Sequence, residues 1–346
     1  MFKAIDFFCG GGGMTCGLRQ AGIDVVAGVD FDASVGPTYE YNNPGSAFVN
    51  SDIKRLRSTY FERKFGVQRN DDFLIMVGCS PCQYYSIINH DTTKSKLSKD
   101  LLMNFARFVD YYRPGYVLVE NVPGIMTSND SILPQFLKKL DKMGYIHVVK
   151  DVINMSEYGV PQSRRRFSLI ASRLDGVKLS LPEKDNHISI LSEFIGEAHG
   201  FPKIEAGHRD KTDFMHSTAA LDAISLERMR LTPHDGGSRL AWAGDERLQL
   251  KCYIGRDDCF RDNYGRMSWR KPAPTITTRF SSVSTGRFAH PEEDRCISIR
   301  EGATLQTFPR DYVFKTTNMA TAAKIIGNAV PPEYARRLGE TICNNQ

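Results

Sequence analysis

Short apolar runs alternate with polar or glycine-containing segments through the first half of the chain. Each run has the length of a strand buried in a sheet, and several runs end at a glycine or an acidic residue. The predicted strands cover residues 3–8, 25–29, 47–49, 73–77, 116–119, 146–152 and 167–171. Apolar side chains from Leu101 to Tyr112 recur at helical spacing and predict a packed helix. This alternation is typical of an open α/β sheet.

The regular alternation is lost from about Leu181, where Pro, Gly, His, Asp and Arg become more frequent. Aromatic residues lie among the basic loops of this region: Trp242, Tyr253, Tyr264 and Trp269. Such a surface suits phosphate and base contacts, although an ordinary solvated surface with a few packed rings has the same composition. A last helix, Glu333 to Ile342, is expected to pack back on the first domain. The predicted division is therefore residues 1–178, 179–317 and 318–346.

Length, composition and charge narrow the class of protein. A chain of 346 residues can hold one large domain and a smaller one. Its net charge of +5 is compatible with nucleic acid but does not identify it as the partner. No apolar run is long enough to cross a bilayer, and the start lacks a signal-peptide pattern. With eight cysteines and no secretory signal, we expect free thiols in a cytoplasmic, reducing compartment and no membrane association.

One cysteine lies where chemistry is expected. Cys82 follows the predicted strand at residues 73–77 and comes directly after Pro81. The carboxyl ends of strands are where open α/β sheets bind ligands, so we hypothesise that Cys82 is a nucleophile. Cys79 and Cys82 also form a C-x-x-C pair, which leaves a redox dithiol or a zinc site open. Zinc would need a second ligand pair, and Cys252 and Cys259 lack the usual spacing, so no metal is expected.

A glycine-rich turn from Cys9 to Gly17 follows the first predicted strand. Such a turn lets a ligand approach the backbone closely. The spacing does not satisfy G-x-G-x-x-G, which favours a nucleotide-like cofactor without a pyrophosphate. Asp30 lies about twenty residues after the glycines, where an acid would meet a ribose, and Phe31 could stack on an adenine. A tight structural turn remains the alternative interpretation.

Three further segments end or begin predicted strands. Asp52 and Ile53 follow the third predicted strand and are candidates to contact the cofactor's base, although Asp52 could instead cap a following helix. Glu120 ends a buried strand, where a carboxylate needs either a partner or a function, and a salt bridge is the alternative. Arg164 and Arg166 would point the same way on an extended segment, unless they belong to a solvated basic turn.

The order of these motifs resembles the C5-cytosine DNA methyltransferases that use S-adenosylmethionine. The resemblance covers nearly the whole chain and rests on five stretches: residues 6–17, Pro81-Cys82-Gln83, Glu120-Asn121-Val122, residues 162–166 and Gly327-Asn328-Ala329-Val330-Pro331-Pro332. Tyr85 and Cys9 depart from the usual residues without removing a reacting group. The resemblance implies a Rossmann-like mixed sheet with helices on both faces and a smaller, loop-rich target-recognition domain.

The resemblance also implies a role for each site residue. Cys82 would attack C6 of a flipped-out cytosine, and Glu120 would hydrogen-bond N3 and the exocyclic amino group. Arg166 would meet O2 of the base, and Arg164 would help hold a loop that starts at Gln83, contains Ser86 and closes behind the base. The residues matching cofactor contacts are Phe8, Gly10, Gly12, Gly13, Asp30, Phe31, Asp52, Ile53, Leu101 and Asn328.

The implied substrate is double-stranded DNA in a bacterial or phage-infected cell, with a cognate restriction endonuclease as a separate partner. Two alternatives stay open. Some relatives of the same fold modify tRNA, although the long variable region favours DNA. Other relatives are binding modules with an inactive site, and intact Cys82 and Glu120 argue against that interpretation.

Overall fold

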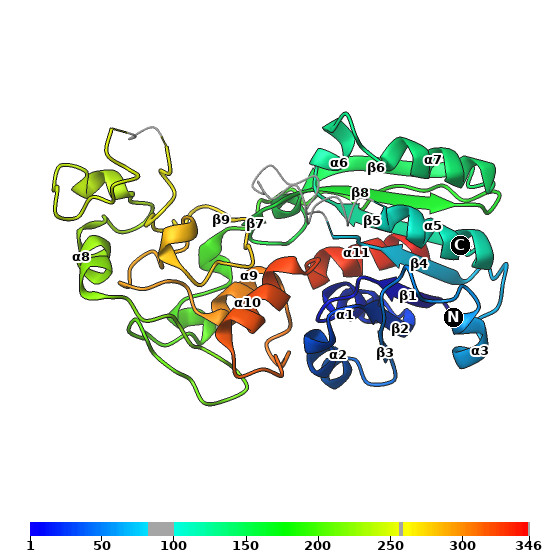
Figure 1. Cartoon of the computed structure of the whole chain (residues 1–346), viewed down its shortest axis with the longest axis horizontal. Helices are drawn as coiled ribbons and strands as arrows, with labels where there is room; N and C mark the ends of the chain where they lie inside the picture. Colours follow the sequence, from blue (N-terminus) through cyan, green and yellow to red (C-terminus); the bar gives the residue numbers. More distant parts are fainter. Residues whose placement is uncertain (82–99, 256–258, 345–346) are drawn as a thin grey trace. The chain divides into compact units, whose positions relative to one another are not determined.

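The computed structural model describes residues 1–81, 100–255 and 259–344, so Cys82, Gln83 and Ser86 lie outside the described residues. The chain forms two compact units. The first comprises Met1–Asn154, Arg165–Lys184 and Val330–Gln346, and the second comprises Met155–Arg164 and Asp185–Ala329 (Figure 1). The sequence analysis divided the chain at residues 178 and 317. In the structure the chain passes from one unit to the other four times, after residues 154, 164, 184 and 329.

The first unit is built on a seven-stranded sheet with the order β3-β2-β1-β4-β5-β8-β6. Its strands are β1 Lys3–Phe7, β2 Asp24–Asp30, β3 Ala47–Asn50, β4 Leu74–Gly78, β5 Tyr116–Asn121, β6 His147–Asn154 and β8 Arg165–Ser172. The strands β1 to β5 pair in parallel, whereas β8 runs antiparallel to both β5 and β6. The seven predicted strands are confirmed to within a few residues at each end.

Helices cover both faces of this sheet (Figure 1). They are α1 Gly13–Gln20, α2 Gly36–Asn42, α3 Tyr60–Phe65, α5 Leu101–Tyr112, α6 Gly124–Thr127, α7 Leu133–Lys142 and α11 Pro332–Cys343. On one face, Phe7 packs its ring against Phe105 and Phe108 of α5. On the other face, the Tyr334 hydroxyl of α11 donates to Ser168 Oγ of β8. The predicted α/β class, with a mixed sheet and helices on both faces, is confirmed.

The predicted C-terminal helix is α11, which packs against α1 from the opposite end of the chain (Figure 1). The two helices meet at Gly17, where an added Cβ would lie 2.1 Å from the Pro332 carbonyl oxygen. A residue larger than glycine would force the helices apart. The last glycine of this stretch therefore serves the packing of α1 on α11.

The second unit has little regular structure. Its elements are β7 Gln162–Ser163, β9 Ala273–Pro274, α8 Ala223–Leu231, α9 Ile299–Leu305 and α10 Met319–Asn328. Buried arginines organise it by donating to backbone carbonyls. Arg266 donates to the carbonyl oxygens of Thr232, Met229 and Glu293 at 2.7–2.9 Å. Buried backbone carbonyls in a loop need hydrogen-bond donors, because they have no neighbouring strand to supply them. The guanidinium groups of these arginines supply the donors here.

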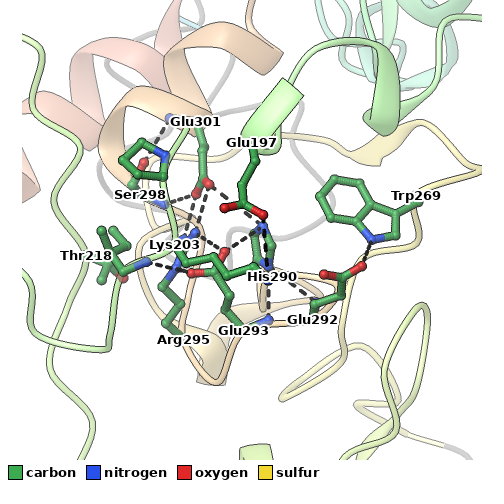
Figure 2. A network of polar contacts seen from close by, with 12 residues as sticks. Glu197, Lys203, Thr218, Trp269, His290, Glu292, Glu293, Arg295, Ser298 and Glu301 are labelled. Carbon is green, nitrogen blue, oxygen red and sulfur yellow. Dashed lines mark hydrogen bonds and ion pairs between the residues drawn. The ribbon is translucent and has the colours of Figure 1, made fainter. Parts of the chain in front are cut away.

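A second arginine anchors the start of α9 (Figure 2). Arg295 and Glu301, both fully buried, form a bidentate pair at 2.7 and 2.9 Å. Ser298 and Glu301 also form a capping box, in which the Ser298 N–H donates to the carboxylate and the Ser298 hydroxyl accepts from the Glu301 N–H. Arg295 lowers the pKa of Glu301 to about 2 against the opposing effect of burial.

Within residues 1–81, 100–255 and 259–344, no three His, Cys, Asp or Glu side chains lie together in a way that could hold a metal ion. Cys252 and Cys259 are both exposed. None of the described helices is long and apolar enough to cross a membrane.

Candidate active site

The glycine turn connects β1 to α1 through a left-handed backbone. Phe8, Gly10 and Gly12 have φ values of 64°, 52° and 92°. Phe8 is the notable member, since a bulky residue with positive φ is held there by its surroundings and such residues cluster at ligand sites. A Cβ built on Gly10 meets no atom within 4 Å, so the space beside this backbone is open. Gly13 begins α1 directly after the turn.

Asp30 holds the glycine turn in place from the end of β2. Its carboxylate accepts from the Gly10 N–H at 2.9 Å and from the Asp32 N–H at 2.9 Å. Burial raises the pKa of Asp30, and the two N–H donors oppose that effect. This hydrogen bond joins two residues that are twenty positions apart in the sequence. The role of Asp30 toward a cofactor stays a prediction.

The predicted adenine contacts follow β2 and β3, which are neighbours in the sheet. The Phe31 ring is 71% exposed, so its face is available for stacking. The Ser51 N–H donates to the Asp30 carbonyl, and the Asn50 side chain donates to the Phe31 carbonyl, which ties the two strand ends together. Asp52 accepts from the Lys54 N–H in a turn and does not cap a helix directly.

Three remaining predicted contacts occupy defined positions. Ile53 is buried in the core of the first unit, and Leu101 packs against that core from the start of α5. Asn328 is the last residue of α10 and belongs to the second unit. An open backbone at Gly10, an exposed ring at Phe31 and an acid at the end of β2 fit a nucleoside-bearing cofactor.

A buried acid beneath the glycine turn was missed by the sequence analysis. Asp6 accepts from the Thr15 hydroxyl at 2.8 Å, and Thr15 contacts the Tyr39 hydroxyl, which contacts Ser46 at 2.7 Å. Burial raises the pKa of Asp6 to about 7 despite the Thr15 hydrogen bond. Asp6 is visible in the sequence as an acid inside an apolar strand, but its partners lie on three other segments.

The segment after β4 is tied to the neighbouring strand β5 at Ser80. After β4, the Ser80 carbonyl and hydroxyl both accept from the Asn121 side-chain amide at 3.2 Å, and the Asn121 side-chain oxygen Oδ1 accepts from the Val122 N–H at 2.9 Å. Asn121 directly follows Glu120, so hydrogen bonds within the first unit join the residue after Glu120 to Ser80. Cys79 is partly buried, and burial together with Glu120 and Asp6 raises the pKa of its thiol well above the usual value.

Glu120 has a cationic neighbour on the adjacent strand. Arg166 Nε lies 3.2 Å from Glu120 Oε1, and both side chains are largely buried. Glu120 pairs in register with Ser168 of β8, so Arg166, two residues along, points from the same face of the sheet. The structure thus brings together two of the predicted catalytic side chains.

Arg164 does not share the environment of Arg166 and contacts backbone carbonyls instead. Its guanidinium is buried in the second unit and donates to the carbonyl oxygens of Ile276, Gly327 and Ala329 at 3.0–3.3 Å. Gln162 of the same motif donates to Gln306 and accepts from the Ile276 N–H, both at 2.8 Å. These two side chains connect segments of the second unit, and a role for Arg164 in loop closure stays a prediction.

Replacing Asn121 with aspartate should lower the free energy of unfolding by about 1–3 kcal/mol, because the isosteric side chain loses its donors and faces the Ser80 carbonyl with a charge. Urea denaturation would measure the change. The control is Asn104→Asp on α5, whose amide donates to the Asp100 carbonyl at an exposed site. Equal losses in both variants would contradict a specific role for Asn121.

Three features fit a group-transfer enzyme with a nucleoside-bearing cofactor: a parallel sheet extended by an antiparallel strand, a glycine turn with a partly buried acid at the end of β2, and a Glu–Arg pair on adjacent strands. A family model described as C-5 cytosine-specific DNA methylase matches residues 2–344. The chain therefore belongs to the C-5 cytosine-specific DNA methylase family and is a DNA cytosine methyltransferase, as the sequence resemblance predicted.

Individual relatives agree with this assignment. The chain is 35% identical to the Type II methylase M.HgiDII of Herpetosiphon aurantiacus, over 98% of this chain and 94% of the relative. It is 28% identical to the Type II methyltransferase M.DdeI of Desulfomicrobium norvegicum, over 98% and 88%. In fold, it is similar to a protein assigned as a prophage-encoded DNA modification methyltransferase of E. coli, with a TM-score of 0.75, 21% identity and coverage of 100% and 99%.

Proposed function

We propose that this enzyme transfers a methyl group from S-adenosylmethionine to C5 of a flipped-out cytosine in a specific double-stranded DNA sequence, through a covalent bond between Cys82 and C6. The observation that carries the proposal is the Glu120–Arg166 pair at 3.2 Å, together with the hydrogen bonds from Asn121 to Ser80, two residues before Cys82 in the sequence. A carboxyl group and a guanidinium side by side can meet the N3 edge and O2 of one pyrimidine ring.

The chemistry follows from the ring. The Cys82 thiolate adds to C6, and the electron pair of the C5–C6 double bond moves into the ring toward N3 and O2. Glu120, protonated or sharing a proton with N3, and Arg166 at O2 stabilise that charge. C5 would then bond to the methyl carbon as the bond from that carbon to the sulfonium sulfur breaks, and S-adenosylhomocysteine would leave as the product. Loss of the C5 proton re-forms the double bond and expels the Cys82 thiolate.

S-adenosylmethionine supplies the methyl group as an electrophile on a positively charged sulfonium. Phe8, Gly10, Gly12 and Gly13 would line its methionine side, and Asp30 would bind the ribose hydroxyls. The adenine would stack on Phe31, with Asp52, Ile53, Leu101 and Asn328 completing the site. The open backbone at Gly10 and the exposed Phe31 ring support this assignment.

The DNA contacts are assigned to the second unit, whose arginine-anchored loops take the place of the predicted target-recognition domain. The loop containing Gln83 and Ser86, with Arg164, would close behind the flipped base. Two similar proteins are named Type II modification enzymes, which supports a restriction-modification role beside a separate cognate endonuclease inside a bacterial or phage-infected cell.

Methyl incorporation tests the proposal. The purified enzyme with labelled S-adenosylmethionine should label duplex DNA, and bisulfite sequencing of plasmid from an expressing host should show 5-methylcytosine at one recurrent sequence. Labelling of tRNA alone would contradict the proposed substrate. A duplex carrying 5-fluorocytosine at the target should remain covalently attached, because fluorine cannot leave C5 as a proton does. Methylation without such an adduct would contradict the covalent step.

A further inference from the structure

A basic cavity lies on the first unit between the end of β3 and α3. Its volume is about 420 Å³, and its cationic lining consists of Arg55, Arg57, Arg63 and Lys64. Ser51, Thr59 and Tyr60 also line it, and no acidic residue of the described part of the chain does. Neither the proposed cofactor contacts nor the proposed catalytic residues include any of these side chains.

The cations are left without acidic partners. In the part of the chain that the structure describes, none of Arg55, Arg57, Arg63 and Lys64 forms an ion pair. The two acids of residues 51–66 are used elsewhere: Asp52 accepts from the Lys54 N–H, and Glu62 accepts from the Tyr111 hydroxyl at 2.6 Å. Five cations and two carboxylates give this stretch a net charge of +3, within a chain whose net charge is +5.

The cavity walls are held by buried contacts. Phe61 of α3 packs on Phe7 and Phe108, which fixes the inner face of the helix and leaves Arg63 and Lys64 on its exposed side. Arg107 of α5 donates to the carbonyl oxygens of Ile53 and Leu56 at 2.8 and 2.9 Å. This guanidinium fixes the turn that carries Arg55 and Arg57.

We propose that this cavity binds a backbone phosphate of DNA, and that it adds a sequence-independent contact from the first unit. Guanidinium groups match phosphate oxygens with paired donors, and serine and threonine hydroxyls are common further donors. A ligand without negative charge would leave four cations uncompensated. The inference rests on the proposed function, because DNA is the polyanion that this enzyme meets in every turnover.

Salt dependence of DNA binding tests the proposal. Removing one phosphate contact should reduce the slope of log K against log salt concentration by about 1. We expect this change, with several-fold weaker binding at low salt, in Arg55→Gln/Arg57→Gln and independently in Arg63→Gln/Lys64→Gln. The loss should be equal for duplexes with and without the methylated sequence, and kcat at saturating DNA should stay unchanged.

The control removes the same charge from another face of the same unit. Lys138→Gln/Lys142→Gln alters two exposed lysines of α7 and should leave the slope within error of the unsubstituted enzyme. Unchanged slopes in both cavity variants, or equal changes in the control, would overturn the proposal. A different result would assign the cavity to free phosphates and overturn the DNA assignment: the slopes stay unchanged, millimolar pyrophosphate raises the thermal stability of the unsubstituted enzyme, and this stabilisation is lost in the cavity variants.

These outcomes are distinct from failure of the proposed function. An enzyme that methylates duplex DNA but shows no slope change refutes only the phosphate cavity. An enzyme that labels no duplex DNA refutes the proposed function, whatever its binding slope.

Discussion

Replacing Cys82 with serine is expected to abolish methyl transfer and to leave S-adenosylmethionine binding within a few-fold of the unsubstituted enzyme. A serine hydroxyl is a far weaker nucleophile than a thiolate, and loss of a nucleophile that acts with its neighbours costs on the order of 10⁴-fold or more in rate. Single-turnover incorporation of labelled methyl groups would measure the rate, and calorimetric titration would measure cofactor affinity.

Cys79 offers a matched control three residues away. Burial and the charges of Glu120 and Asp6 raise the pKa of its thiol well above the usual value, so it stays protonated near neutral pH. Cys79→Ser should therefore retain methyl transfer to within about tenfold. Near-normal turnover by Cys82→Ser would rule out the covalent route. If both variants lost turnover and also lost cofactor binding, the cause would be a folding defect instead.

Much of the first unit could be predicted because its signals are local. The apolar runs correctly predicted β1 to β5, β6 and β8, because a strand buried on both faces is a continuous apolar segment of the sequence. Glu120 and Cys82 stood out as reactive groups at strand ends. The direction of β8 was not available from the periodicity, because parallel and antiparallel neighbours have the same alternation.

What the sequence analysis missed depends on contacts between distant segments. The chain from Asp6 through Thr15 and Tyr39 to Ser46 joins four segments, and no spacing rule places these side chains together. In the second unit, Arg266 and Arg295 are fully buried, although composition alone assigns arginines to the surface. Ser298 and Glu301 did carry a visible signal, the S-x-x-E capping pattern.

The second large effect concerns the buried pair of Arg295 and Glu301. Replacing Arg295 with methionine should lower the free energy of unfolding by about 3–5 kcal/mol, because it leaves Glu301 charged and fully buried without its partner. Glu293, which also contacts Arg295, would lose that partner too. Urea denaturation at pH 7 would measure the loss. The double variant Arg295→Met/Glu301→Leu should recover part of the loss, because the unpaired buried carboxylate is gone while the Ser298 N–H loses its acceptor.

An exposed pair of the same geometry is the control. Arg247 binds Glu227 with two hydrogen bonds of 2.6 Å, but the two side chains are 59% and 40% exposed. Solvent screens such a pair, so Arg247→Met should cost less than about 1 kcal/mol. Equal costs in the two variants would show that burial of the Arg295–Glu301 pair does not set its energy.

The same pair predicts a pH dependence. The pKa of Glu301 falls from 4.5 to about 2 on folding, so its contribution to stability is present above about pH 4.5 and is lost as the pH falls through 2. That shift corresponds to about 3 kcal/mol. Glu301→Gln keeps the shape of the side chain and removes its titration, while His290 beside it titrates in both proteins. The difference in unfolding free energy between the two proteins should therefore shrink by this amount between pH 5 and pH 2, and a constant difference would contradict the assignment of acid sensitivity to Glu301.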